Sequence, residues 1–175
     1  MLACCMLCTG SCAPLLIQQR YHISGFERSW NEYKRGFGDT NSNYWIGNDM
    51  LSWLTTNDNY TLRFDLQARS TGKWFYAEYS TFVVLPEAQN YKLQVAGFSG
   101  NAGGDALGYS NDMMFSTYDR DNDHDSGSCA KRWGGGFWYK MCSLCDVNDI
   151  IMRWYKGTFA DNWKLQASRM WLQCK

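Results

Sequence analysis

The sequence predicts a single domain in which two short helices precede an antiparallel β-sheet. Two stretches, residues 27–35 and 48–56, have apolar side chains at helical spacing, and the region 59–98 instead alternates with period two. The chain of 175 residues contains no internal repeat or low-complexity linker and only two prolines. A domain of this length buries roughly 70% of its unfolded surface, so one hydrophobic core is sufficient.

Both helices have recognisable ends. Gly36 and Gly38 follow the first helix as stop signals, and Asn48 or Asp49 is placed to cap the start of the second. The apolar faces consist of Trp30 and Tyr33 in the first helix and of Met50, Leu51 and Leu54 in the second.

Three consecutive antiparallel strands are predicted after the helices. The alternating runs are YTLRFDLQA, KWFYAEYSTFVV and NYKLQVAGF, and the turn-forming segments STGK and PEAQ separate them. Beyond residue 99 the periodicity disappears, and Gly, Asn, Asp and Ser dominate up to residue 136. Such a long irregular segment in a compact domain is usually functional, metal-bound or disordered.

Composition excludes several classes of protein. Aromatic residues make up 17% of the chain and charged residues 19%, which excludes a disordered tail or a coiled coil. Seventeen basic residues balance seventeen acidic ones without a basic run, so we expect no nucleic-acid partner. No apolar stretch approaches the roughly 18 residues that cross a bilayer, so we expect a soluble domain without membrane insertion.

The N-terminal segment, residues 1–16, is apolar like the core of a signal peptide but lacks the basic residues that precede one. We interpret it as a degenerate signal-like segment or an artefact of a truncated gene model, with a disulfide or metal cluster as the alternative. Residues 17–175 then form the domain. The segment holds four of the eight cysteines, which are Cys4, Cys5, Cys8, Cys12, Cys129, Cys142, Cys145 and Cys174.

The most informative local pattern is YDRDNDHDSGSC, in which Asp119, Asp121, Asp123 and Asp125 alternate with other residues. Hard divalent cations need several oxygen ligands, and carboxylates two residues apart on an irregular loop converge readily. Calcium is the natural candidate, and a fully solvated loop is the alternative.

Enzymatic and EF-hand interpretations of this loop fail. An EF-hand needs glycine and glutamate at loop positions that here hold His124 and Ala130. A metal–nucleotide site at Asp121 and Asp123 would need an α/β nucleotide fold with a glycine-rich phosphate loop. The chain has only two histidines, so a hydrolytic triad has few ways to assemble. We therefore expect no enzyme.

The pair Cys142 and Cys145 forms a C-x-x-C motif, but it lacks the βαβ context of a redox site and the second pair of a zinc site. A structural disulfide between Cys129 and Cys142 is the simpler account, and it contributes on the order of 3 kcal/mol. Asn59 begins an N-glycosylation sequon, which has meaning only in a secreted chain.

In this order the motifs resemble the fibrinogen C-terminal domain of fibrinogen chains, ficolins, tachylectins, tenascins and angiopoietins. The resemblance runs from about Ile17 to Asn148, with a weaker match beyond. Its segments are IQQR, SWNEYKRGFGD, YWIGND, LTTNDNYTLRFDL, YAEYSTFVV, YKLQVAGFSGNAGGDAL and MMFSTYDRDNDHDSGSCAKRWGGGFWYKMC.

The resemblance implies an α+β fold, with a central antiparallel sheet flanked by short helices and a loop-rich calcium-binding subdomain. It implies that the side chains of Asp121 and Asp123 and the main-chain carbonyls of Asp125 and Gly127 bind Ca²⁺, with Asp119 in a supporting role. It also implies the Cys129–Cys142 disulfide. Compared with the family, we expect the usual N-terminal subdomain to be absent or replaced by residues 1–16, and its loss would expose sheet surface that is normally covered.

The resemblance also implies a ligand pocket next to the calcium site. In acetyl-recognising members the counterparts of Trp133, Cys142 and Ser143 line it, and the Met141–Cys142 peptide bond would be cis. Ser143 stands where those members have a histidine, and the substitution removes an imidazole donor. This difference counts against acetyl recognition.

Two functions follow as expectations. The first is a secreted, calcium-dependent, lectin-like module of innate immunity that binds glycans or acetylated groups. The alternative is a protein-binding signalling or matrix domain of the angiopoietin or tenascin type, whose partner is a cell-surface or matrix protein. A homo-oligomer is an open alternative to a monomer, since Cys145 or Cys174 could pair between chains.

Overall fold

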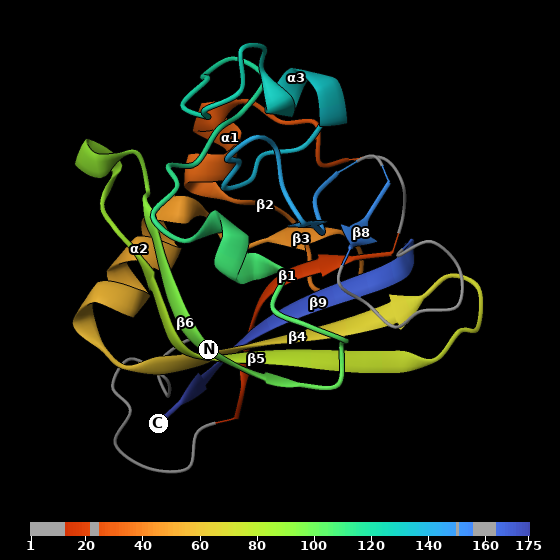
Figure 1. The fold of residues 1–175 in the computed structure, drawn as a ribbon. Coiled ribbons are helices and arrows are strands. Elements are labelled where there is room, and N and C mark those ends of the chain that lie inside the picture. The colour runs from red at the N-terminus through yellow and green to blue at the C-terminus, as the bar shows by residue number, and fades with distance from the viewer. Residues whose placement is uncertain (1–12, 22–24, 150, 156–163) are drawn as a thin grey trace.

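The computed structural model describes residues 13–21, 25–149, 151–155 and 164–175. Seven strands form one sheet in the order β2-β3-β1-β9-β4-β5-β6, and every neighbouring pair is antiparallel (Figure 1). The strands are β1 (Leu15–Arg20), β2 (Phe37–Gly38), β3 (Tyr44–Trp45), β4 (Tyr60–Ala68), β5 (Trp74–Val84), β6 (Leu93–Gly100) and β9 (Leu165–Cys174), with β7 (Cys145–Asp146) and β8 (Arg153–Trp154) forming a separate pair. The predicted α+β class and antiparallel sheet are confirmed.

Helix α1 (Trp30–Arg35) begins with a capping box. The Ser29 side chain accepts a hydrogen bond from the backbone N–H of Glu32, and the Glu32 carboxylate accepts one from the backbone N–H of Ser29. Gly36 ends the helix at a φ of 90°, a conformation that favours glycine, as the sequence predicts.

Helix α2 (Asn48–Asn57) begins differently from the prediction. Its N-cap is Gly47, and no side chain caps the helix. The side chain of Asn48 instead accepts a hydrogen bond of 3.0 Å from the indole Nε1 of Trp45. The Asn48 side chain therefore serves as the hydrogen-bond acceptor of the buried Trp45 indole and does not cap the helix.

The strands β4, β5 and β6 follow one another in the sheet as predicted. The strand β9 was not predicted, and it lies between β1 and β4, so the C-terminus of the chain occupies the middle of the sheet. No helix in the described residues is long and apolar enough to cross a membrane.

One face of the sheet packs against the loop-rich region. Phe64 of β4 contacts Trp154, and Phe82 of β5 contacts Trp138, both edge to face. The rest of this core is a cluster of buried aromatic rings. It includes Tyr33, Trp45, Phe115 and Trp138.

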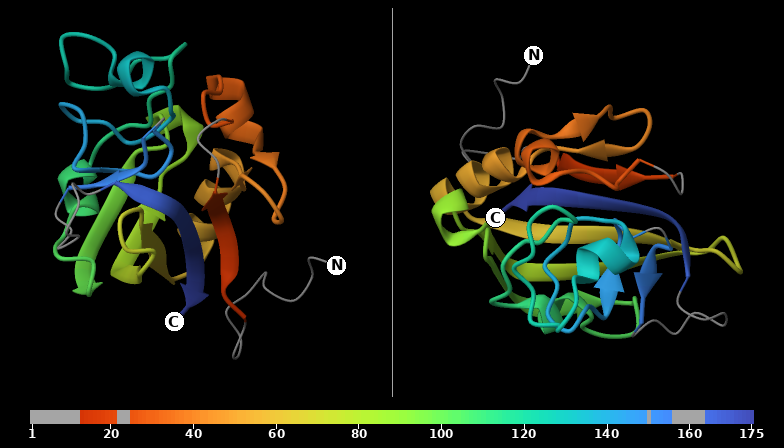
Figure 2. Two further views of the ribbon diagram at one scale, coloured as in Figure 1. Left: turned by 90° about the vertical axis from the view of Figure 1, so that its right-hand side faces the viewer. Right: turned by 90° about the horizontal axis from the view of Figure 1, so that it is seen from above.

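The loops that carry the predicted site lie above the sheet on the same side as α1. The short helices η1 (Glu87–Gln89), η2 (Leu107–Ser110) and α3 (Cys129–Trp133) are the helices described between β5 and β7. The left view of Figure 2 shows α3 and its neighbouring loops at the same end of the molecule as α1.

Candidate functional site

The acidic loop is shaped by a chain of turns that its own aspartates close. Asp121 Oδ1 accepts the N–H of Asp123 at 3.3 Å, and Asp123 Oδ1 accepts the N–H of Asp125 at 2.8 Å. Asp125 Oδ1 then accepts the N–H of Gly127 at 3.0 Å. Each carboxylate thus bonds the backbone two residues later, which is the Asx turn that alternating aspartates favour.

Two aspartates connect this loop to neighbouring helices. Asp123 Oδ2 accepts the N–H of Cys129, the first residue of α3, at 2.8 Å. Asp119 Oδ1 accepts the N–H of Trp30 in α1 at 2.9 Å and the hydroxyl of Thr117 at 2.7 Å. Asp119 therefore supports the loop from outside the predicted ligand set.

The carboxylate and carbonyl oxygens of this loop are of the chemical type that hard divalent cations bind. Burial raises the pKa of the Asp123 carboxyl, and the neighbouring charge of Asp121 raises this pKa further. The two hydrogen bonds that Asp123 accepts from backbone N–H groups act in the opposite direction and lower it. Within the described residues, neither Asp121 nor Asp123 makes an ion pair with a basic side chain. A cation would offset this repulsion, and Asp121 and Asp123, with the carbonyls of Asp125 and Gly127, would hold it.

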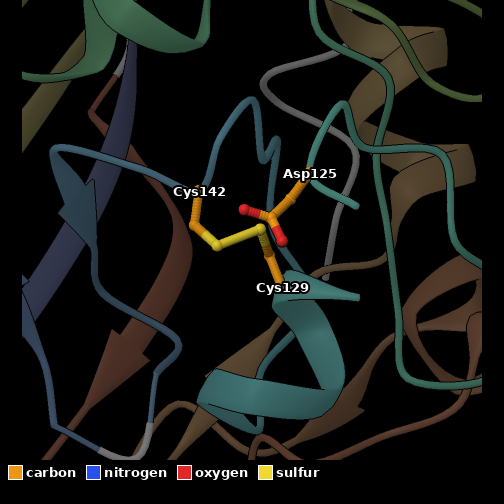
Figure 3. A group of neighbouring side chains, drawn as sticks. All are labelled: Asp125, Cys129 and Cys142. Carbon is orange, nitrogen blue, oxygen red and sulfur yellow. A yellow bond between two sulfur atoms is a disulfide. The ribbon is translucent and has the colours of Figure 1, made fainter. Parts of the chain in front are cut away.

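The disulfide between Cys129 and Cys142 lies directly beside the Asp125 carboxylate (Figure 3). The bond joins α3 to the segment that follows the cis peptide bond between Met141 and Cys142. The two sulfur atoms and an Asp125 oxygen lie within 4.8 Å of one another. Disulfide sulfurs are not thiolates, so this grouping is not a thiolate metal site.

A pocket of about 170 Å³ opens beside the disulfide and contains all three predicted ligand-binding residues. Trp133, Cys142 and Ser143 line it, as the sequence predicts. The other lining residues, which were not predicted, are Arg132, Met141, Asp146, Asp149, Arg153 and Tyr155.

Arg153 occupies the face of Trp133. Its guanidinium carbon lies 3.8 Å from the centroid of the Trp133 ring, and its side chain is only 9% exposed. The same guanidinium forms an ion pair with Asp149 and donates to the Tyr155 hydroxyl at 2.7 Å. The aromatic surface expected to contact a ligand is therefore covered by a side chain of the domain itself.

Asp146 forms the buried floor of the pocket. It accepts hydrogen bonds from the Tyr139 hydroxyl at 2.5 Å and from the N–H groups of Asn148 and Asp149 at 2.9 Å. Burial, reinforced by the charge of Asp149, raises the pKa of this carboxyl to about 7. The buried guanidinium of Arg20 acts in the opposite direction.

The remaining sequence predictions concern Asn59 and the other cysteines. Asn59 is exposed just after α2, which leaves room for a glycan. Cys145 is a free thiol with no exposed surface, which disfavours its pairing between folded chains. Cys174 is disulfide-bonded. Residues 1–12, including Cys4, Cys5, Cys8 and Cys12, lie outside the described residues.

Comparison with known proteins identifies the family. The model of the C-terminal globular domain of fibrinogen beta and gamma chains matches residues 2–173. Human angiopoietin-4 is 36% identical over 173 residues, which is 90% of this chain and 34% of that protein. Mouse tenascin is 40% identical over 91% of this chain and 7% of tenascin. The chain thus spans less than half the length of these relatives.

Solved structures agree with this similarity. The fibrinogen-like globe domain of human ANGPTL2 superposes with a TM-score of 0.82 at 32% identity, over 91% of this chain and 79% of that domain. The lamprey fibrin D-dimer, in complex with the peptide Gly-His-Arg-Pro-amide, also gives a TM-score of 0.82, at 29% identity over 92% of this chain and 61% of that structure. The chain therefore belongs to the family of the fibrinogen C-terminal globular domain.

Proposed function

We propose that this chain is an extracellular, non-enzymatic recognition domain that binds a protein partner, and that calcium stabilises its acidic loop. Angiopoietin and tenascin relatives at 36% and 40% identity favour the signalling or matrix type over a lectin. The Cys129–Cys142 disulfide is consistent with an oxidising extracellular environment.

The observation that carries the proposal is the placement of Arg153 on Trp133. An acetyl group needs an apolar surface and a donor, but here the indole is covered by a guanidinium and the expected imidazole is replaced by Ser143. The lining of the pocket instead includes two arginines, Arg132 and Arg153, and two carboxyls, and of these four groups Arg132 is the exposed one. A charged lining of this kind suits the charged side chains and backbone groups of a protein surface.

The comparison with the lamprey structure supports a peptide-like ligand. That protein is complexed with a short basic peptide. In this chain the carboxylate of Asp149 is already paired with Arg153, so a ligand would have to engage the exposed side of the pocket. Arg132, whose side chain is 50% exposed, is the charged group best placed to meet it.

Calcium would act on the loop and perform no chemistry. By neutralising Asp121 and Asp123 it would hold the start of α3, because Asp123 also accepts the N–H of Cys129. The helix α3 carries both Arg132 and Trp133, so a firm loop fixes one wall of the pocket.

The test compares binding of the folded domain, fused to a reporter, to mammalian cells and to an N-acetylglucosamine resin. We expect binding to cells that is lost after protease treatment, is retained after enzymatic deglycosylation, and weakens at least tenfold in Arg132→Glu. We expect no retention on the resin.

Retention on the resin that requires calcium and is released by free acetate would overturn the proposal in favour of the lectin. Lys92→Glu is the matched control for charge reversal, because Lys92 lies directly before β6 and outside the pocket, and its ion pair with Asp112 is partly exposed. Circular dichroism of each variant verifies that it folds.

A further inference from the structure

The sheet has a second face, which points away from the loop-rich region. Leu62, Phe64 and Leu66 of β4 are buried in the core, so the residues between them, Arg63 and Asp65, lie on the opposite side of the sheet. We call this side the outer face. Its side chains are only partly covered, since those of Arg63 and Asp65 keep 32% and 25% of their surface exposed.

The strand register arranges the side chains of the outer face in two parallel rows. Residues directly opposite one another in antiparallel strands place their side chains on the same face. The first row runs across β9, β4 and β5 and consists of Trp171, Arg63 and Glu78. The second row lies two residues further along β4 and consists of Arg169, Asp65 and Tyr76. The two rows are therefore about 7 Å apart.

The outer face is rich in aromatic rings and arginines. The guanidinium carbon of Arg63 lies 4.6 Å from the centroid of the Tyr76 ring, and that of Arg169 lies 5.3 Å from the ring of Trp74, which is 44% exposed. A hollow of about 260 Å³ has Arg63 and Trp171 among its lining residues. Tryptophan, tyrosine and arginine are enriched at the centres of protein interfaces, so this face has the composition of a contact surface.

The charged groups of the outer face keep hydrogen-bonding capacity that the described chain does not use. Arg63 donates from Nε to Asp65 and from Nη1 to Glu78, both at 2.9 Å, and its Nη2 makes no hydrogen bond to a described residue. Arg169 forms no ion pair within the described part of the chain. The Asp65 oxygens accept from Arg63 and Trp171, and each can accept a further bond.

The two rows are complementary to each other, and this property identifies the partner. When one outer face is laid on another, a two-fold axis that runs across the strands midway between the rows exchanges the rows. Arg63 then meets Asp65 of the second copy, and Arg169 meets the Trp171 ring of the second copy, and each contact occurs twice. The strands of the two sheets run nearly aligned, as in sheets that pack face to face about 10 Å apart.

We propose that the outer face packs against the same face of a second copy of this chain, which makes the domain a two-fold symmetric dimer. The second copy presents a carboxylate and an aromatic ring at the spacing that Arg63 and Arg169 require. The pocket beside the disulfide lies on the other side of the sheet, where Phe64 contacts Trp154, so it stays open in both copies. The proposal therefore does not depend on what the pocket binds.

Sedimentation equilibrium of the unmodified chain measures this association. We expect a reversible dimer with twice the 20.2 kDa mass of the chain. A protein that remains monomeric at about 0.5 mM would overturn the proposal. A dimer that stays covalent in denaturing electrophoresis without reductant would also overturn it, because a disulfide and not the outer face would then join the copies.

Two charge reversals test the geometry of the interface. Arg63→Glu brings two carboxylates together at each Arg63–Asp65 contact across the axis, and Asp65→Arg brings two guanidinium groups together. Each variant alone should dimerise at least about tenfold more weakly than the wild type. Mixed in equal amounts, the two variants should form a heterodimer of about wild-type affinity, because every such contact then joins opposite charges. A mixture that associates no better than either variant alone would refute this arrangement.

Two further variants serve as controls. Lys92→Glu reverses a charge just before β6, whereas Glu78 pairs with Ser99 near the other end of that strand, so this variant should dimerise like the wild type. Arg63→Gln removes the charge without adding a carboxylate, and it replaces Arg63→Glu if that variant fails to fold by circular dichroism. It should weaken the dimer several-fold, and an unchanged affinity would contradict the proposal.

Discussion

Asp146 is a residue at which pH should change the stability of the domain. Its pKa is about 7 in the folded domain, against an ordinary value of 3.8. The folded state therefore binds this proton more tightly than the unfolded state does, and the resulting stability is greatest below pH 4 and is lost as the pH rises through 7. We expect the contribution of Asp146 to fall over this interval by at most about 4 kcal/mol, because one pKa unit corresponds to about 1.4 kcal/mol.

Thermal unfolding of the wild type and of Asp146→Asn between pH 4.5 and pH 8 measures this effect. The variant keeps an oxygen that accepts from Asn148 and Asp149 but cannot ionise, so its Tm should depend less on pH. Asp112→Asn, which removes a carboxyl that is 58% exposed, is the control for the loss of a surface carboxyl. Parallel pH curves for the wild type and Asp146→Asn would contradict the assignment.

Arg153 should be the most sensitive residue of the pocket. Removing it by Arg153→Ala leaves Asp149 buried without its cation and uncovers the Trp133 ring. Loss of one partner of a buried ion pair costs about 3–5 kcal/mol, which urea unfolding would detect. Arg28→Ala breaks a half-exposed pair with Glu32 and should cost at most about 1 kcal/mol, so equal losses would refute this role.

At the scale of elements, the local sequence was sufficient to predict a feature wherever all the residues that form it are neighbours in the chain. The end of α1 at Gly36 and the strands β4 and β5 were predicted from patterns within a few residues. The strand β9 was missed because its identity depends on pairing with β1 and β4, which lie about a hundred or more residues away.

In the candidate site too, features formed by neighbouring residues could be predicted, whereas contacts between residues distant in the chain could not. The turns of the acidic loop depend on carboxylates two residues apart and are visible in the sequence. Arg153 and Asp146 come from a stretch without periodicity, and they meet Trp133 and Arg20 only through the tertiary fold. No local pattern could have predicted that the guanidinium of Arg153 covers the indole of Trp133.

The acidic loop should respond to calcium as a unit. Calcium at one hundred times its dissociation constant stabilises the folded state by about 2.7 kcal/mol, so calorimetry should show a higher Tm with calcium than with chelator. Asp123→Asn should abolish this difference, because Asp123 is a predicted ligand and also holds the N–H of Cys129. Asp58→Asn, outside the loop, should retain it. An unchanged Tm on chelation of the wild type would refute a structural calcium site.

At the scale of the whole molecule, the central position of β9 makes the C-terminus indispensable. Nine residues of β4 pair with β9, whose other side pairs with β1, so its removal would divide the sheet into two parts with unpaired edges. Leu165, Met170 and Leu172, all buried, would also leave the core.

The fragment 1–164 should therefore show no cooperative thermal transition and little near-ultraviolet circular dichroism. A variant without residues 1–12 keeps every strand of the described residues and should unfold cooperatively. Cooperative unfolding of the fragment 1–164 would mean that the helices and β4–β6 fold on their own, and that β9 is added to a sheet already formed.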